Sequence, residues 1–251
     1  MVVVSICPQV YQVGGSYFSH PDDCSVYLVE SENKLALIDA GVGKRTEQIL
    51  ENIKDCGFSP DRVEYILVTH GHIDHIGGLK YLKEKTGALV VAHQLELEAI
   101  ENGNPALTAA DWYGVKYQPV KVDRVIKQDG ETLTMGQIEF QFLHTPGHTP
   151  GSLSILCRCP DSKILFGQID KARKFPGMPR CAGLKILFGQ DIHGPFNREW
   201  GSDLNQWRSS MQRLLSLEAD ILCEGHFGVY EPAAAVRKYI ESYLRRYTSF
   251  S

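Results

Sequence analysis

Three histidines and one aspartate fall within six residues of this chain, at His70, His72, Asp74 and His75. Imidazole nitrogens and carboxylate oxygens are ligands that zinc, iron and manganese accept in proteins. Side chains of an extended segment alternate, so positions 70 and 72 face the same way. If the chain then turns into a helix, positions 74 and 75 swing back toward the same point. The run therefore predicts a turn that binds a metal ion.

Further ligand-type residues lie downstream, each after a predicted strand. His148 lies in a tight loop of glycines and prolines, Asp191 follows the strand Ile186–Gly189, and His226 follows the sequence Cys-Glu-Gly. Open α/β sheets bind their ligands at the ends of strands. We therefore expect these residues to complete the site that begins at His70.

A local duplication bears on the choice of Asp191. The sequence Lys-Ile-Leu-Phe-Gly-Gln occurs at 163–168 and again at 185–190, and Asp170 also follows its copy of this strand. Asp170 falls one position later than Asp191 does, and a slip of one residue turns a side chain to the opposite face of a strand. We therefore assign the ligand to Asp191. Residues 169–184, rich in basic residues and proline, are expected to form an inserted surface loop.

The elements that must position these residues follow from hydrophobic patterning. Strands are predicted at Ser25–Val29, Leu35–Ile38, Val63–Thr69, Ala88–Ala92, Ile138–Leu143, Ser152–Cys157, Lys163–Gly167, Ile186–Gly189 and Asp220–Cys223. Helices are predicted at Thr46–Cys56, Gly77–Lys85, Ser202–Leu217 and Pro232–Arg246. The turn Glu30–Lys34 should join the first two strands. This mixture predicts a layered α/β (α+β) fold. No linker divides the sequence, so we expect one domain over residues 1–251.

Bulk composition excludes several classes of protein. The chain has 251 residues, 43% of them hydrophobic, and a formal net charge of −4. Without a basic excess, nucleic acid is not expected as a partner. We see no apolar run long enough for a membrane span and no convincing signal peptide. Seven scattered cysteines are typical of reduced thiols, so we expect a soluble, cytoplasmic protein.

The order of the motifs resembles the metallo-β-lactamase fold superfamily, from about Asp39 to His226. The sequence Asp39-Ala40-Gly41 resembles the acidic turn that buttresses the metal site in that superfamily. The resemblance implies a four-layer αβ/βα sandwich of two mixed β-sheets flanked by helices. It assigns one metal ion to His70, His72 and His148, a second ion to Asp74, His75 and His226, and a bridging role to Asp191. Asp74 and His226 are also the residues expected to take part in catalysis.

The same resemblance implies an activity. A hydroxide between two divalent ions would attack an ester-like bond, with a thioester or a lactone as the expected substrate. Zinc is the first candidate for both ions, and iron and manganese also suit these ligands. The glyoxalase-II-like branch is the nearest, but about 25 residues follow His226, which predicts one helix and no glutathione-binding domain. The alternative is a persulfide dioxygenase with one iron ion on His70, His148 and Asp191.

Three residues are candidates for a substrate pocket. His193 lies two positions after Asp191, His20 lies in an early loop, and Tyr113 lies in the segment Asn102–Pro119. The aromatic residues of that segment are open to three interpretations: the wall of a pocket for a small molecule, the interface of a homodimer, or packing in the buried interior.

Overall fold

The computed structural model describes residues 3–158 and 183–248, and these form two mixed β-sheets. The first sheet has seven strands in the order β1-β2-β3-β4-β5-β6-β7. They are β1 Val4–Cys7, β2 Val10–Gly14, β3 Val26–Ser31, β4 Lys34–Ile38, β5 Val63–Leu67, β6 Leu89–His93 and β7 Arg124–Ile126. The second sheet has six strands in the order β13-β12-β11-β10-β9-β8. They are β8 Thr132–Met135, β9 Ile138–His144, β10 Leu153–Arg158, β11 Lys185–Phe188, β12 Ile221–Cys223 and β13 Val229–Tyr230.

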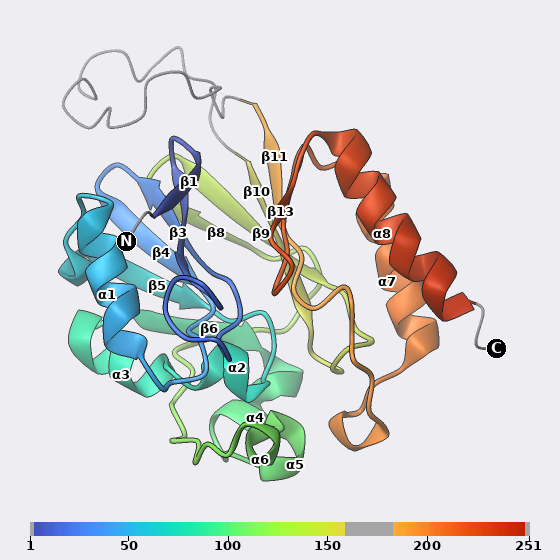
Figure 1. Ribbon diagram of the computed structural model, residues 1–251, viewed down its shortest axis with the longest axis horizontal. Coiled ribbons are helices and arrows are strands. Elements are labelled where there is room, and N and C mark those ends of the chain that lie inside the picture. Colours follow the sequence, from blue (N-terminus) through green and yellow to red (C-terminus); the bar gives the residue numbers. More distant parts are fainter. Residues whose placement is uncertain (1–2, 159–182, 249–251) are drawn as a thin grey trace.

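The sheets pack face to face between two layers of helices (Figure 1). One buried cluster lies between the sheets, with Ile38 and Val91 from the first and Phe140 and Phe188 from the second. A second cluster joins the outer face of the first sheet to α1 and α3, and a third joins the second sheet to α7 and α8. Strands buried on both faces need apolar residues at nearly every position, as β4 and β10 have. The predicted four-layer αβ/βα sandwich is confirmed.

The longer helices agree with the predicted ones to within a few residues. The helices are α1 Thr46–Asp55, α2 Ile73–Ile76, α3 Leu79–Thr86, α4 Leu97–Ile100, α5 Pro105–Thr108, α6 Ala110–Tyr113, α7 Leu204–Ser216 and α8 Ala233–Thr248, with the 3-10 turns η1 Pro60–Arg62, η2 Gln94–Glu96 and η4 Arg198–Trp200. The short helices α4, α5 and α6, which the sequence pattern does not predict, gather at the end of the molecule where α2 lies (Figure 1). None of these helices combines the length and the hydropathy that crossing a bilayer requires.

Two expectations need correction. The turn predicted at Glu30–Lys34 is shorter, because Ser31 pairs with Lys34 and only Glu32 and Asn33 form the loop. Both loop residues have positive φ, which matches the twist of the strands in a two-residue hairpin. The expectation that all cysteines are reduced is wrong for Cys7, which is disulfide-bonded.

Some predictions lie outside the described residues. They are the strand Lys163–Gly167, almost all of the insertion at 169–184, and Asp170. These stay predictions.

Two adjacent glycines, Gly77 and Gly78, let the end of α2 pack against the turn that follows β4. The helix predicted from Gly77 begins instead at Leu79, after the one-turn helix α2. A Cβ atom at Gly77 would lie 2.1 Å from the Val42 carbonyl oxygen, and one at Gly78 would lie 2.2 Å from the Ala40 carbonyl oxygen. The turn after β4 thus approaches α2 at a distance that only glycine allows, and Ala40 N–H donates to the His75 carbonyl (2.8 Å).

We predict that Gly78→Ala lowers the free energy of unfolding by about 3 kcal/mol or more, because backbone atoms on both sides must move. Gly87→Ala is the matched control. Its Cβ would meet open space, and its φ of +75° alone costs roughly 1–2 kcal/mol. Urea denaturation of both variants measures the difference. Equal losses would contradict the close-packing explanation.

Candidate metal centre

The seven predicted ligands converge where loops from both sheets meet. His70 and His72 follow β5, whereas Asp74 and His75 lie on α2, the turn of helix directly after them. The β9–β10 loop carries His148, the segment after β11 carries Asp191, and the β12–β13 loop carries His226. All except His226 are buried, and its side chain is 21% exposed. The chain therefore turns seven ligand-type side chains toward one point inside the fold.

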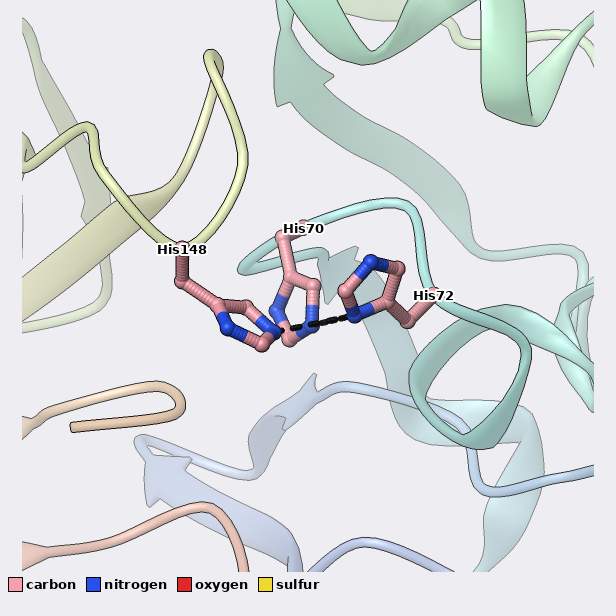
Figure 2. Close-up of side chains that lie close together, drawn as sticks. All are labelled: His70, His72 and His148. Atoms are coloured by element: carbon pink, nitrogen blue, oxygen red, sulfur yellow. Dashed lines mark hydrogen bonds between the residues drawn. The ribbon is translucent and has the colours of Figure 1, made fainter. Parts of the chain in front are cut away.

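Three histidines form the first group (Figure 2). His72 Nδ1 lies 3.1 Å from His70 Nε2 and 2.9 Å from His148 Nε2. Ligands of a tetrahedral zinc ion at the usual Zn–N distance would be about 3.3 Å apart. The three nitrogens thus have nearly the spacing that one metal ion imposes.

Asp74, His75 and His226 form the second group. His226 Nε2 lies 3.2 Å from Asp74 Oδ2 and 3.3 Å from His75 Nε2. Asp191 lies between the two groups. Its Oδ1 is 3.2 Å from His75 Nε2 and 3.4 Å from His226 Nε2, and its Oδ2 is 3.4 Å from His148 Nε2. Each oxygen of Asp191 thus faces a different group.

The ligand-type atoms of the two groups are better satisfied by metal ions than by hydrogen bonds to one another. A neutral imidazole has one N–H, so the three nitrogens of the first group cannot all be satisfied by hydrogen bonds among themselves. Asp191 Oδ1 is buried and accepts no hydrogen bond from the described residues. Buried polar atoms without partners are costly, and a divalent cation in each group would satisfy them.

The two groups differ in their affinity for protons. Burial lowers the pKa of His148 to about 4 and, together with the neighbouring imidazoles, holds the pKa of His70 and His72 well below the ordinary value. Burial would also lower the pKa of His226, but the carboxylates of Asp191 and Asp74 raise it to about 10. Burial would lower the pKa of His75 as well, but Cys24 and the surrounding carboxylates of Asp191, Asp39 and Asp74 raise it well above the ordinary value. Without a metal ion, the first group is therefore neutral at pH 7, whereas the second holds protons on His226 and His75.

Two buried carboxylates hold the second group from behind. Asp39 Oδ2 lies 2.8 Å from His75 Nδ1, and the same carboxylate accepts hydrogen bonds from the Thr69 amide and hydroxyl, each 2.8 Å long. This contact favours a proton on Nδ1 of His75, so Nε2 is the nitrogen that would bind a metal ion. Glu224 Oε2 accepts the His226 amide at 2.6 Å, which fixes the β12–β13 loop. The family resemblance pointed to Asp39. Glu224 was missed, although it precedes the Gly-His pair.

A cavity of about 260 Å³ opens above the metal ligands. Its lining includes two of the three predicted pocket residues, His193 and Tyr113, and His193 Nδ1 lies 3.2 Å from Glu224 Oε1. His20 lies outside the lining, where its Nδ1 accepts the amide of Asp22. Burial, and then the Asp74 carboxylate, raise the pKa of Tyr113, so its hydroxyl keeps its proton.

Three aromatic rings besides Tyr113 line this cavity. The Trp200 ring lies 4.5 Å from that of His72, and the Trp112 ring lies 4.8 Å from Trp200. The Phe227 ring lies 4.7 Å from that of His193. Trp112 is 65% exposed and Phe227 is 56% exposed, which is unusual for such large apolar side chains. The cavity therefore has a polar floor and an aromatic mouth.

A αβ/βα sandwich with histidines and aspartates gathered at the edge of its sheets is typical of one class of metal-binding proteins. The model of the metallo-beta-lactamase superfamily matches residues 20–167. The chain therefore belongs to the metallo-beta-lactamase superfamily, as its motifs indicated.

Two curated relatives and one solved structure illustrate the similarity. The chain is 33% identical over 148 residues to the probable metallo-hydrolase YqgX of Bacillus subtilis, covering 57% of this chain and 65% of YqgX. It is 28% identical over 135 residues to the hydroxyacylglutathione hydrolase GloC of Haemophilus influenzae, covering 53% of this chain and 60% of GloC. Less than two thirds of each relative is thus matched. The subclass B3 metallo-beta-lactamase BJP-1 of Bradyrhizobium japonicum superposes with a TM-score of 0.78 and 22% identity, covering 99% and 93% of the two chains. That likeness concerns the fold.

We predict that acidification releases metal in two phases. The protons that bind His226 and His75 compete with an ion at the second group, so metal affinity there falls by about tenfold or more per pH unit below about pH 10. The first group stays neutral down to about pH 4, the pKa of His148, and keeps its ion longer. Equilibrium dialysis across this range with elemental analysis measures both phases. His226→Ala should remove only the acid-labile ion. Release of both ions in one step would contradict the prediction.

Proposed function

We propose that this protein is a hydrolase that uses two metal ions to cleave an ester-like carbonyl bond, in a thioester or a lactone. The observation that carries the proposal is the position of Asp191, whose two oxygens face two separate groups of ligands. GloC, a relative named for the hydrolysis of hydroxyacylglutathione, supports an acyl compound as the substrate.

Each part of the site has a role in this reaction. Two divalent ions, held by the seven ligands, would activate water and offset the negative charge that develops on the carbonyl oxygen. Asp39 orients the His75 ring, and Glu224 holds the loop of His226. The protonated Tyr113 hydroxyl lines the cavity beside Asp74 and can donate a hydrogen bond to the substrate.

The second ligand group favours this proposal over a dioxygenase with one iron ion. Such an enzyme needs only His70, His148 and Asp191. Here the nitrogen of His226 also lies within 3.4 Å of His75, Asp74 and Asp191. A complete second set of buried donors would be costly to keep without a second ion.

We predict that the purified protein binds two ions per chain and hydrolyses members of a panel of thioesters and lactones. His72→Ala should lose the first ion and lower kcat/KM on the order of 100-fold or more, because a ligand contributes at least as much as the groups that support it. Elemental analysis and hydrolysis rates provide the test. One iron per chain with oxygen uptake on a persulfide would refute the hydrolase, as would a His72→Ala variant that keeps its metal and its activity.

The cavity favours an uncharged, apolar acyl group. Among the described residues, no lysine or arginine lines it, so apart from the histidines of the site a phosphate or carboxylate in the cavity would find no basic side chain. The exposed rings of Trp112 and Phe227 instead offer apolar surface at the mouth. A volume of about 260 Å³ equals that of about nine water molecules, which suits a short acyl or aryl chain.

We predict that Trp112→Ala raises KM for thioesters with apolar acyl groups about tenfold, equivalent to about 1.4 kcal/mol of lost contact, and leaves kcat nearly unchanged. The acetyl thioester should be affected much less, because it does not reach the mouth. Tyr81→Ala, which removes a partly exposed aromatic ring on α3, is the matched control. An equal change in KM for the short and the long substrates would contradict the assignment of the aromatic mouth.

A further inference from the structure

A third buried carboxylate, that of Glu96, lies outside the ligand set. Glu96 is the last residue of η2, the turn directly after β6, and is 4% exposed. Its Oε2 accepts the Gly71 amide at 2.8 Å. Its Oε1 accepts the Thr149 hydroxyl at 2.6 Å and the Gly151 amide at 2.8 Å. Both oxygens are therefore engaged by the protein itself.

The three donors lie on the two loops that carry the first ligand group. Gly71 lies between His70 and His72, in the segment after β5 of the first sheet. Thr149 directly follows His148, in the β9–β10 loop of the second sheet. The Glu96 carboxylate thus connects the loop after β5, in the first sheet, to the β9–β10 loop of the second sheet. These are the two loops that bring the three histidines together.

Two glycines make room for this carboxylate. A Cβ atom at Gly71 would lie 2.7 Å from Glu96 Oε2, and one at Gly151 would lie 2.5 Å from Glu96 Oε1. Real Cβ atoms do not approach oxygen so closely, so a larger residue at either position would displace the carboxylate. The local sequence of both loops therefore fits the side chain of Glu96.

The chemistry of the contact requires a carboxylate. Burying this charge costs several kcal/mol unless hydrogen bonds compensate it. Burial accordingly raises the pKa of Glu96, and the hydrogen bonds from Thr149, Gly71 and Gly151 oppose that shift. A glutamine could accept at one side only, because its NH₂ group would face N–H or O–H donors at the other.

We propose that Glu96 is the positioning residue of the three-histidine group. It sets the spacing of His70, His72 and His148 by tying their loops together, without touching a metal ion or a substrate. The inference rests on the metal binding proposed above for this group, and it does not depend on which substrate is hydrolysed.

Metal titration of the metal-free protein tests this role directly. With Glu96→Gln, Zn²⁺ affinity at the three-histidine group should fall about 10- to 100-fold, the usual loss when a group that supports a ligand is removed. The Co²⁺ absorption spectrum of the same group should change, because its intensity follows coordination geometry. The affinity of the second group should stay within about twofold. Glu101→Gln is the matched control, since Glu101 also accepts a loop amide, that of Val122 at 2.8 Å, away from the ligands.

A second pair of variants covers the case in which Glu96→Gln does not fold. Thr149→Val removes one of the three hydrogen bonds and should weaken Zn²⁺ binding at the same group severalfold, whereas Thr149→Ser keeps the hydroxyl and should restore it. Wild-type affinity and spectrum in folded Glu96→Gln, or in Thr149→Val, would overturn the proposal. Failure of the wild-type protein to hydrolyse any ester-like bond would refute the proposed function alone, because the titration needs no substrate.

Discussion

The structure depends on burying seven metal-binding side chains against one another at the edge of two sheets. Imidazoles that point their lone pairs at each other repel, and carboxylates lose hydration when they are buried. Divalent cations, where bound, would satisfy the inner atoms. Three buried carboxylates outside the ligand set hold the loops that carry the ligand-type residues. Asp39 holds α2, Glu96 holds the three-histidine loops, and Glu224 holds the loop of His226.

This arrangement explains why the two ligand groups differ electrostatically. The first group contains only imidazoles, so burial, together with the neighbouring imidazoles, keeps it unprotonated. The second contains Asp74 and shares Asp191, so protons and metal ions compete for it. Asp191 links the two groups, because its Oδ1 faces the second group and its Oδ2 faces the first. The ligand types of the two groups therefore predict that one ion would be held more tightly than the other.

The strands and the loops that carry the ligand-type residues could be predicted from the sequence, because they depend on patterns among residues close together in the chain. Continuous apolar runs marked the buried strands β5 and β10, and the spacing of the ligand-type residues marked the loops after them. Contacts between distant segments were not readable. Glu96 lies in the run Gln94–Glu98, which reads as an exposed acidic turn, and only the tertiary contacts with Gly71 and Gly151 reveal it as buried. The one-turn helices α4 to α6 are too short for periodicity to mark.

The ring contact between Trp200 and His72 has an optical consequence. The indole of Trp200 lies 4.5 Å from the imidazole and is nearly shielded from water, and the Trp112 ring also packs against it at 4.8 Å. A cation that arrives at His72 changes the electric field on this indole, and a paramagnetic ion such as Cu²⁺ quenches its emission. We therefore expect the emission of Trp200, one of three tryptophans in the chain, to report the binding of a cation at the three-histidine group without a label or a substrate.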